Sequence, residues 1–120
     1  SGSYAALLYG YGGAAAAVAL EEPTGPPTPQ EVACAAAALP SRTLHRTERR
    51  AFQRHLNYAG GADMVLRLRN LVLLAWHERE DPTKGVTLEQ CTSRAPREDA
   101  AALPEVFAFL EAAGAVNYGV

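Results

Sequence analysis

The segment from residue 63 to about residue 80 constrains the fold most strongly, because it is apolar on most sides when it is projected as a helix. One broad face collects the larger apolar side chains, and Leu66 and Leu73 lie on another flank. A helix with this pattern has to be surrounded by neighbouring elements, so we expect it to be the central helix of the domain. The residues of the broad face are Met64, Val65, Leu68, Leu71, Val72, Ala75 and Trp76.

Two shorter helices are expected before this central one. Thr28-Pro29-Gln30-Glu31 combines a capping threonine, a proline at the first helical position and a glutamate three residues after the cap, which is a capping-box pattern. The helix that it opens has to end before Pro40. A second helix is predicted from about residue 44 to residue 58, where apolar and basic side chains separate onto two faces. Its inward side is formed by Leu44, Ala51, Phe52 and Leu56.

Two more helices are expected after the central one. A second capping-box pattern, Thr87-Leu88-Glu89-Gln90, opens a short helix through Cys91. The final helix is entered at Asp99 or restarts at Pro104, because proline disrupts a helix interior, and Gly114 provides its stop. The closing residues are expected to be extended. The chain is therefore predicted to be all-α, a compact bundle of about five helices around the central helix, with no sheet.

The beginning of the chain has a different character. Residues 1–3 resemble an expression scar, and residues 4–27 are rich in alanine, glycine and proline. Although 48% of the whole chain is hydrophobic, much of that fraction is alanine, and this stretch has too few large side chains to offset the entropy of ordering it. We therefore expect residues 1–27 to be a disordered leader and residues 28–120 to be the folded domain.

Basic side chains are concentrated in one short part of the chain. The net charge of −2 excludes a strongly basic or strongly acidic tail as a description of the whole. Between residues 41 and 58, however, five arginines stand against one acid, Glu48, whereas residues 98–120 hold four acids and no lysine or arginine, so we expect a bipolar domain. A row of arginines can contact DNA phosphates or an acidic protein surface, and it can also be an ordinary solvated face. The candidate binding residues are Arg42, Arg46, Arg49, Arg50 and Arg54.

No active site can be assembled from this sequence. Cys34 and Cys91 are far apart and belong to no C-x-x-C pair, so we expect two reduced thiols of a cytosolic or nuclear protein. His45, His55 and His77 have no partner residues at a recurring spacing, and residues 10–15 match a G-x-G-x-x-A dinucleotide motif without a β-α-β pattern around it. We expect no catalytic, cofactor-binding or metal-binding residues. With no apolar run of about 18 residues, we also expect no membrane span.

Several short motifs at fixed spacings resemble one known family. They are Leu66-x-x-Arg69-Asn70, Trp76 six residues later, Val86-Thr87-x-x-x-Cys91, and Phe109-Leu110-x-x-x-Gly114-x-Val116-Asn117-Tyr118-Gly119. In this order the set is similar to the SWIRM domain family, over roughly residues 28–120 and most sharply over residues 63–120. The resemblance implies a SWIRM-type helical bundle whose signature residues are structural, with the tryptophan in the core and polar side chains bonded to loop backbone. The signature residues are Arg69, Asn70, Trp76, Gly114 and Asn117.

The resemblance also implies a setting. SWIRM domains are non-catalytic modules of flavin-dependent lysine-specific histone demethylases, of scaffold subunits of SWI/SNF-type remodellers, and of adaptor subunits of histone acetyltransferase complexes, where DNA binding takes part. The ending Val116-Asn117-Tyr118-Gly119-Val120 and the entry Leu39-Pro40 with Leu44 and Glu48 are closer to the demethylase form. Asp99-Ala100-Ala101-Ala102-Leu103 is closer to the remodeller form. We favour the demethylase setting.

In that setting the chain is expected to be a nuclear, monomeric scaffold module. Its expected partners are the amine-oxidase domain of its parent or other subunits of a chromatin complex, with weak contacts to a histone tail or to DNA as a further expectation. Any FAD would belong to a part of the parent protein outside this chain. The alternatives are the SWIRM domain of a remodeller subunit and a stand-alone DNA-binding module.

Overall fold

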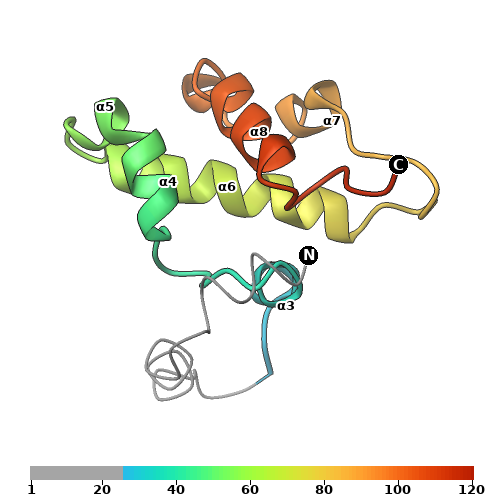
Figure 1. The fold of residues 1–120 in the computed structure, drawn as a ribbon. Coiled ribbons are helices and arrows are strands. Elements are labelled where there is room, and N and C mark those ends of the chain that lie inside the picture. The colour runs from blue at the N-terminus through green and yellow to red at the C-terminus, as the bar shows by residue number, and fades with distance from the viewer. Residues whose placement is uncertain (1–25) are drawn as a thin grey trace.

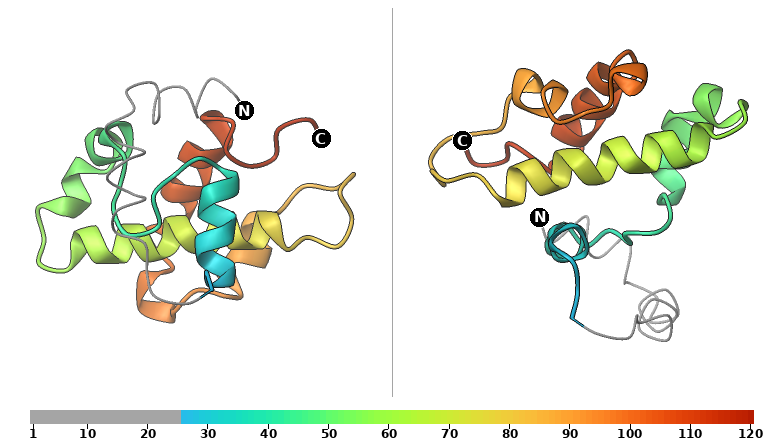
Figure 2. Two further views of the ribbon diagram at one scale, coloured as in Figure 1. Left: turned by 90° about the horizontal axis from the view of Figure 1, so that it is seen from below. Right: turned by 180° about the vertical axis from the view of Figure 1, so that it is seen from behind.

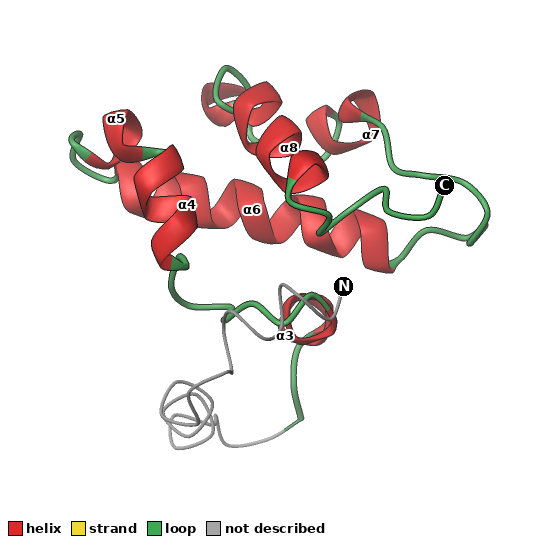
Figure 3. Cartoon of the chain, viewed as in Figure 1, coloured by secondary structure: helices red, strands yellow, loops and turns green. Residues whose placement is uncertain are grey.

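The computed structural model describes residues 26–120 (Figure 1). Within that range the protein is all-α, with helices joined by loops and no strand (Figure 3). The α-helices of this range are α3 (Pro29–Ala36), α4 (Arg46–Ala51), α5 (Gln53–Leu56), α6 (Gly61–His77), α7 (Leu88–Thr92) and α8 (Leu103–Ala112), and a 3-10 helix spans Arg97–Asp99.

Helix α6 is the central element, as its apolar pattern predicts. Val65, Leu68 and Val72 have no exposed surface, because neighbours cover the helix on several sides. Helix α3 crosses α6 on one side, and α7 and α8 pack on the opposite side (Figures 1 and 2). The short α5 packs against α6 near its first turn, at the end of the molecule away from the loop that leads into α7.

Both predicted capping boxes are present. The Glu31 amide donates to the Thr28 hydroxyl (3.2 Å), and the Thr28 amide donates to the Glu31 carboxylate (2.8 Å), at the start of α3. At the start of α7 the Gln90 amide donates to the Thr87 hydroxyl (3.1 Å), and the Thr87 amide donates to the Gln90 side chain (2.8 Å). Each box satisfies two backbone donors that a helix leaves free at its N-terminus.

The helix predicted over residues 44–58 is divided in two. Phe52, with φ −106° and ψ 20°, separates α4 from α5. Its ring is buried and meets the Phe109 ring edge-on, with 5.1 Å between the ring centroids. Ala51, which the projection places on the inward face, is exposed instead. The projection assumed a straight helix with a constant period of 3.6 residues. The bend at Phe52 interrupts that period, so the residues around it face other directions than the projection predicts.

The end of the chain also differs from the prediction. Helix α8 starts at Leu103 with Pro104 in its first turn, and Gly114 (φ 76°) follows its C-terminal end as expected. Residues 115–120 are not extended, however, because Asn117 (φ 57°) and Gly119 (φ 75°) both adopt the left-handed conformation and the segment forms turns. The expectation of a disordered leader over residues 1–27 and the glycine motif at residues 10–15 lie outside the described residues, apart from residues 26 and 27.

Candidate interaction surface

Four exposed arginines lie close together in the chain, between residues 42 and 50. Arg46, Arg49 and Arg50 lie within one turn and a third of α4, and Arg42 lies in the loop that precedes it. We call these four residues the arginine surface. None of the four takes part in an ion pair with another residue of the range 26–120. Within this range the guanidinium groups of Arg46, Arg49 and Arg50 are therefore available to an external anion. Hydrogen bonds from Thr28 and, to a smaller extent, the charge of Arg42 lower the pKa of Glu31 in α3, so Arg42 has one acid near it.

The one acid of this segment does not offset these charges, because Glu48 points inward. Its side chain has no exposed surface, and its carboxylate lies 3.5 Å from Nε of Arg69, which is equally buried. Burial raises the pKa of Glu48, against the opposing effects of the Arg69 charge and of the hydrogen bond from the His45 amide. The outer side of α4 consequently carries basic side chains and no acidic one.

The burial of Glu48 is a feature that our sequence analysis missed. A signal was present, because residues 44, 48 and 52 are four apart and share one face of a helix. Leu44 and Phe52 are both buried on that face, and Glu48 lies between them in sequence. A carboxylate at such a position predicts a buried cationic partner, since an unpaired charge in a core costs several kcal/mol.

Arg69 and Asn70 of α6 hold the loop that carries Arg42. Arg69 donates from one terminal nitrogen to the carbonyl oxygens of Pro40 (2.7 Å) and Thr43 (2.5 Å), and Asn70 donates to that of Ser41 (2.8 Å). These are the bonds to loop backbone that the signature residues are expected to make. The thiol of Cys34 in α3 donates in turn to the Asn70 carbonyl oxygen (3.2 Å), which joins α3 to the same group.

Helix α4 begins at an unusual cap. His45 is the N-cap residue, and its amide donates to the Glu48 carboxylate (2.8 Å). Burial, together with the neighbouring charges of Arg46 and Arg69, lowers the pKa of His45. The imidazole is therefore neutral at physiological pH, so that Nδ1 is able to accept from the Thr47 amide (3.2 Å).

Arg54, the fifth candidate residue, is engaged within the molecule. Its guanidinium forms an ion pair with Glu105 in the first turn of α8, and Nε2 of His55 lies 3.3 Å from the other oxygen of the same carboxylate. Arg67 of α6 pairs similarly with the buried Asp99 (3.3 Å). The expectation of two separate charged poles is therefore wrong at this point, because ion pairs join basic side chains of α5 and α6 to acidic side chains near the end of the chain.

The other signature residues lie at the opposite end of α6. Trp76 is 7% exposed, with the Arg79 guanidinium stacked on its ring at 3.3 Å from the centroid and the Tyr118 ring at 5.2 Å. Asn117 accepts from the Val86 amide (2.7 Å) and donates to the Val86 carbonyl (2.9 Å), which ties the end of the chain to the loop before α7. These contacts are architectural.

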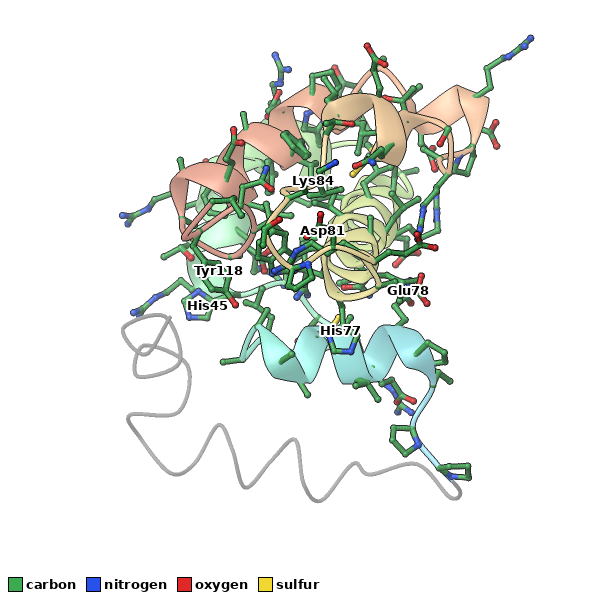
Figure 4. The ribbon with its side chains drawn as sticks, turned by 90° about the vertical axis from the view of Figure 1, so that its right-hand side faces the viewer. His45, His77, Glu78, Asp81, Lys84 and Tyr118 are labelled. Carbon is green, nitrogen blue, oxygen red and sulfur yellow. The ribbon has the colours of Figure 1, made fainter. Side chains whose placement is uncertain are left out.

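A polar groove of about 820 Å³ lies at the same end, between the end of α6 and α7. Figure 4 looks onto this end, with His77 and Glu78 at the end of α6 and Asp81 and Lys84 in the following loop. Three acidic and three basic side chains line the groove, and one pair, Arg94 and Glu78, is joined at 3.2 Å. Because these charges offset one another, the groove favours neither an anion nor a cation, unlike the arginine surface.

No constellation of groups for catalysis emerges among residues 26–120. Cys34 and Cys91 are both fully buried, and burial raises the pKa of each thiol to about 11, so neither is a nucleophile near neutral pH. In the same range no group of three or more histidine, cysteine, aspartate or glutamate side chains is placed to hold a metal ion. Nor is any helix there long and apolar enough to cross a membrane.

Comparison with known protein families gives a match that covers most of the described residues. The SWIRM domain family matches residues 31–118. The chain belongs to the SWIRM family. The SWIRM resemblance of the sequence motifs is thereby confirmed, and the all-α fold agrees with it. No curated protein and no solved structure gave a significant match.

Membership of the SWIRM family gives the domain a general role. SWIRM domains are non-catalytic modules of chromatin proteins, which are generally nuclear, and they mediate contacts with other proteins or with DNA. An exposed surface for a partner, rather than a catalytic pocket, is the kind of site that such a module needs. In this SWIRM domain the arginine surface meets that description, because it is exposed, of one charge sign and not consumed by internal ion pairs.

Proposed function

We propose that this SWIRM domain is a module of a flavin-dependent, lysine-specific histone demethylase and that it binds an acidic protein surface through its arginine surface. The observation that carries the proposal is the burial of Glu48, which leaves four exposed arginines and no exposed acid between residues 42 and 50. The acidic surface belongs to the amine-oxidase domain of the parent protein or to another subunit of its complex. A histone tail is itself basic, so it would require a different face of the domain.

The demethylase setting rests on the sequence of the two ends of the domain. Val116-Asn117-Tyr118-Gly119 and Leu39-Pro40 favour it over the remodeller setting, which Asp99-Ala100-Ala101-Ala102-Leu103 favours. The parent protein decides between them. A G-x-G-x-x-G motif and bound flavin in the full-length protein support the demethylase, whereas a Myb-like domain after the SWIRM domain contradicts it.

The docking proposal is tested by binding in trans. The SWIRM domain and the remainder of its parent protein are purified separately, and their affinity is measured by calorimetry over a range of salt concentrations. We expect the Arg46→Glu/Arg50→Glu variant to bind at least about tenfold more weakly than wild type, because two favourable charge interactions become repulsive. The fold is expected to survive, since both side chains are exposed.

A matched control separates the position of the charges from their number. Lys84→Glu/Arg97→Glu makes the same change in net charge at two exposed residues, one in the loop after α6 and one in the 3-10 helix. This control is expected to bind within about twofold of wild type, since salt screens charges that lie away from the bound partner. An equal loss of affinity in both variants would show that binding depends only on net charge, and it would contradict a specific docking surface.

DNA is a second candidate partner for the same residues. Three of the four arginines lie within α4, where guanidinium groups are able to contact neighbouring phosphates. With so few cations we expect binding without sequence preference, at a dissociation constant of about 10⁻⁴ M at physiological salt, the weak end of the non-specific range. Steep salt dependence that disappears in Arg46→Glu/Arg50→Glu, together with no affinity for the parent protein, would favour DNA over the docking proposal.

A further inference from the structure

Helix α4 is joined to the core by charge rather than by apolar contact. It has six residues, and the only one of them that is buried is Glu48. A helix of this length is not stable by itself, so its position has to be fixed by tertiary contacts. The apolar anchors Leu44 and Phe52 lie outside its two ends.

One guanidinium of α6 reaches both the helix and the loop before it. Arg69 pairs with Glu48 through Nε, while its terminal nitrogen NH2 donates to the carbonyls of Pro40 and Thr43. The second oxygen of Glu48 accepts from the His45 amide, which closes the cap of α4. Arg69 is therefore connected to the start of the loop, to its end and to the first turn of the helix.

We propose that Arg69 is the positioning residue of the arginine surface, because it fixes the geometry in which Arg42 and the α4 arginines are presented. Asn70, which holds the carbonyl of Ser41, assists it. The proposal rests on the docking function for its consequence in binding, but not for its structural content. A segment held in place before binding loses less conformational entropy when a partner arrives, so releasing it weakens binding while every exposed arginine is still present.

Two conservative variants test this role. Arg69→Lys keeps the positive charge but replaces the planar fork by a single ammonium, whose donors all lie on one nitrogen and do not reproduce the separate positions of Nε and the terminal nitrogen. Glu48→Gln keeps the acceptor for the His45 amide but removes the charge that pairs with Arg69. Should one variant fail to fold, the other still probes the same contact. Asn117→Ala serves as the control, since it removes hydrogen bonds at the opposite end of α6.

The readout is amide hydrogen exchange resolved to single residues. The amides of Arg49 and Phe52 donate within α4 (2.9 Å each), and those of Leu68 and Val72 report on α6. In Arg69→Lys and Glu48→Gln we expect the α4 amides to exchange at least about tenfold faster than in wild type and to lose more protection than those of α6, because the segment held by Arg69 opens locally. In Asn117→Ala the α4 amides are expected to stay as protected as in wild type.

The same variants are then titrated with a poly-glutamate peptide as the acidic probe. Several-fold weaker binding of Arg69→Lys than of wild type is expected. Unchanged exchange in α4 of both folded variants, or equal acceleration in α4 and α6, would overturn the positioning role. Failure of the wild-type protein to bind the probe, with selective exchange in α4, would instead count against the docking function and leave the positioning role supported.

Discussion

At the scale of single residues, the side chains around Trp76 illustrate how one aromatic ring organises the end of the central helix. The Arg79 guanidinium covers one part of the ring, as a cation–π contact, and Tyr118 packs near it from the end of the chain. Arg79 also donates to the Trp76 carbonyl (2.8 Å). The indole thus connects α6 to a segment that has no regular secondary structure.

Replacing this ring should be costly. We expect Trp76→Ala to lower the free energy of unfolding by about 3–5 kcal/mol, through the lost burial and the cavity that remains. Tyr118, which is 52% exposed, provides the comparison, and Tyr118→Ala should cost no more than about 1.5 kcal/mol, the scale of an aromatic pair. Chemical denaturation of the three proteins measures both values. Similar costs for the two variants would mean that Trp76 is not the anchor of this region.

At the scale of elements, connections between irregular segments matter as much as helix packing. The side chain of Asn117 bonds both the backbone amide and the backbone carbonyl of Val86, as a neighbouring strand would. Its carboxamide oxygen lies so close to Gly85 that a Cβ at that position would collide with it. Two segments without helix or strand are therefore joined as a strand pair would be, but by one side chain. The left-handed conformation of Asn117 is part of the same arrangement.

This connection is open to a simple test. Asn117→Ala should lower the free energy of unfolding by about 1–3 kcal/mol, because a partly buried donor and acceptor lose their partner. Asn117→Gly removes the same hydrogen bonds but tolerates the positive φ, so it should be the less destabilised of the two. Equal stability of the wild type and the alanine variant would show that water replaces the side chain at no cost.

Sequence patterns predicted the elements whose causes are local. The boxes at Thr28 and Thr87 mark helix starts, and the period of the central segment marks α6, because caps and periodicity act within a few residues. The bend at Phe52 could not be read this way, since its reason is a ring on α8. The burial of Glu48 has a local signal in its position between Leu44 and Phe52, but its partner, a guanidinium far along the chain, does not. Of the candidate site, the positions of the arginines were predictable, whereas the internal pairing of Arg54 was not.

At the scale of the whole molecule, two buried thiols connect stability to pH. Burial raises the pKa of Cys34 and of Cys91 from the ordinary value of 9.0 to about 11. Between these values the unfolded chain gives up thiol protons while the folded chain keeps them. The contribution of the two protonated thiols to the free energy of unfolding is therefore complete below pH 9, and it is lost as the pH rises toward 11.

The predicted loss can be measured as a slope. Each thiol should lower the free energy of unfolding by about 1.4 kcal/mol per pH unit between pH 9 and pH 11. For the two thiols together the loss is on the order of 5 kcal/mol. Cys91→Ala should reduce the slope to about half, whatever its effect on stability near neutral pH. Urea denaturation of the wild type and the variant over this pH range gives both slopes. If the free energy of unfolding falls with pH at the same slope in the wild type and in Cys91→Ala, the pKa of Cys91 is the same in the folded and the unfolded chain.

The isolated molecule should be without redox activity. We expect purified chain to carry no flavin absorbance, and to release no hydrogen peroxide from a methylated histone peptide, because the FAD of the proposed parent lies outside this chain. Absorbance spectra and a coupled peroxide assay measure these properties. A yellow protein with bound flavin would contradict this expectation and direct attention to the glycine motif at residues 10–15.

The most direct test of docking through the arginine surface is a footprint of the SWIRM domain on the remainder of its parent protein. Amide hydrogen exchange is measured at single residues for the free domain and for the bound domain. We expect slower exchange in the bound state over the loop at residues 41–45 and over α4, with little change at the groove between α6 and α7. Protection confined to that groove or to α8, with the arginine surface unchanged, would contradict it.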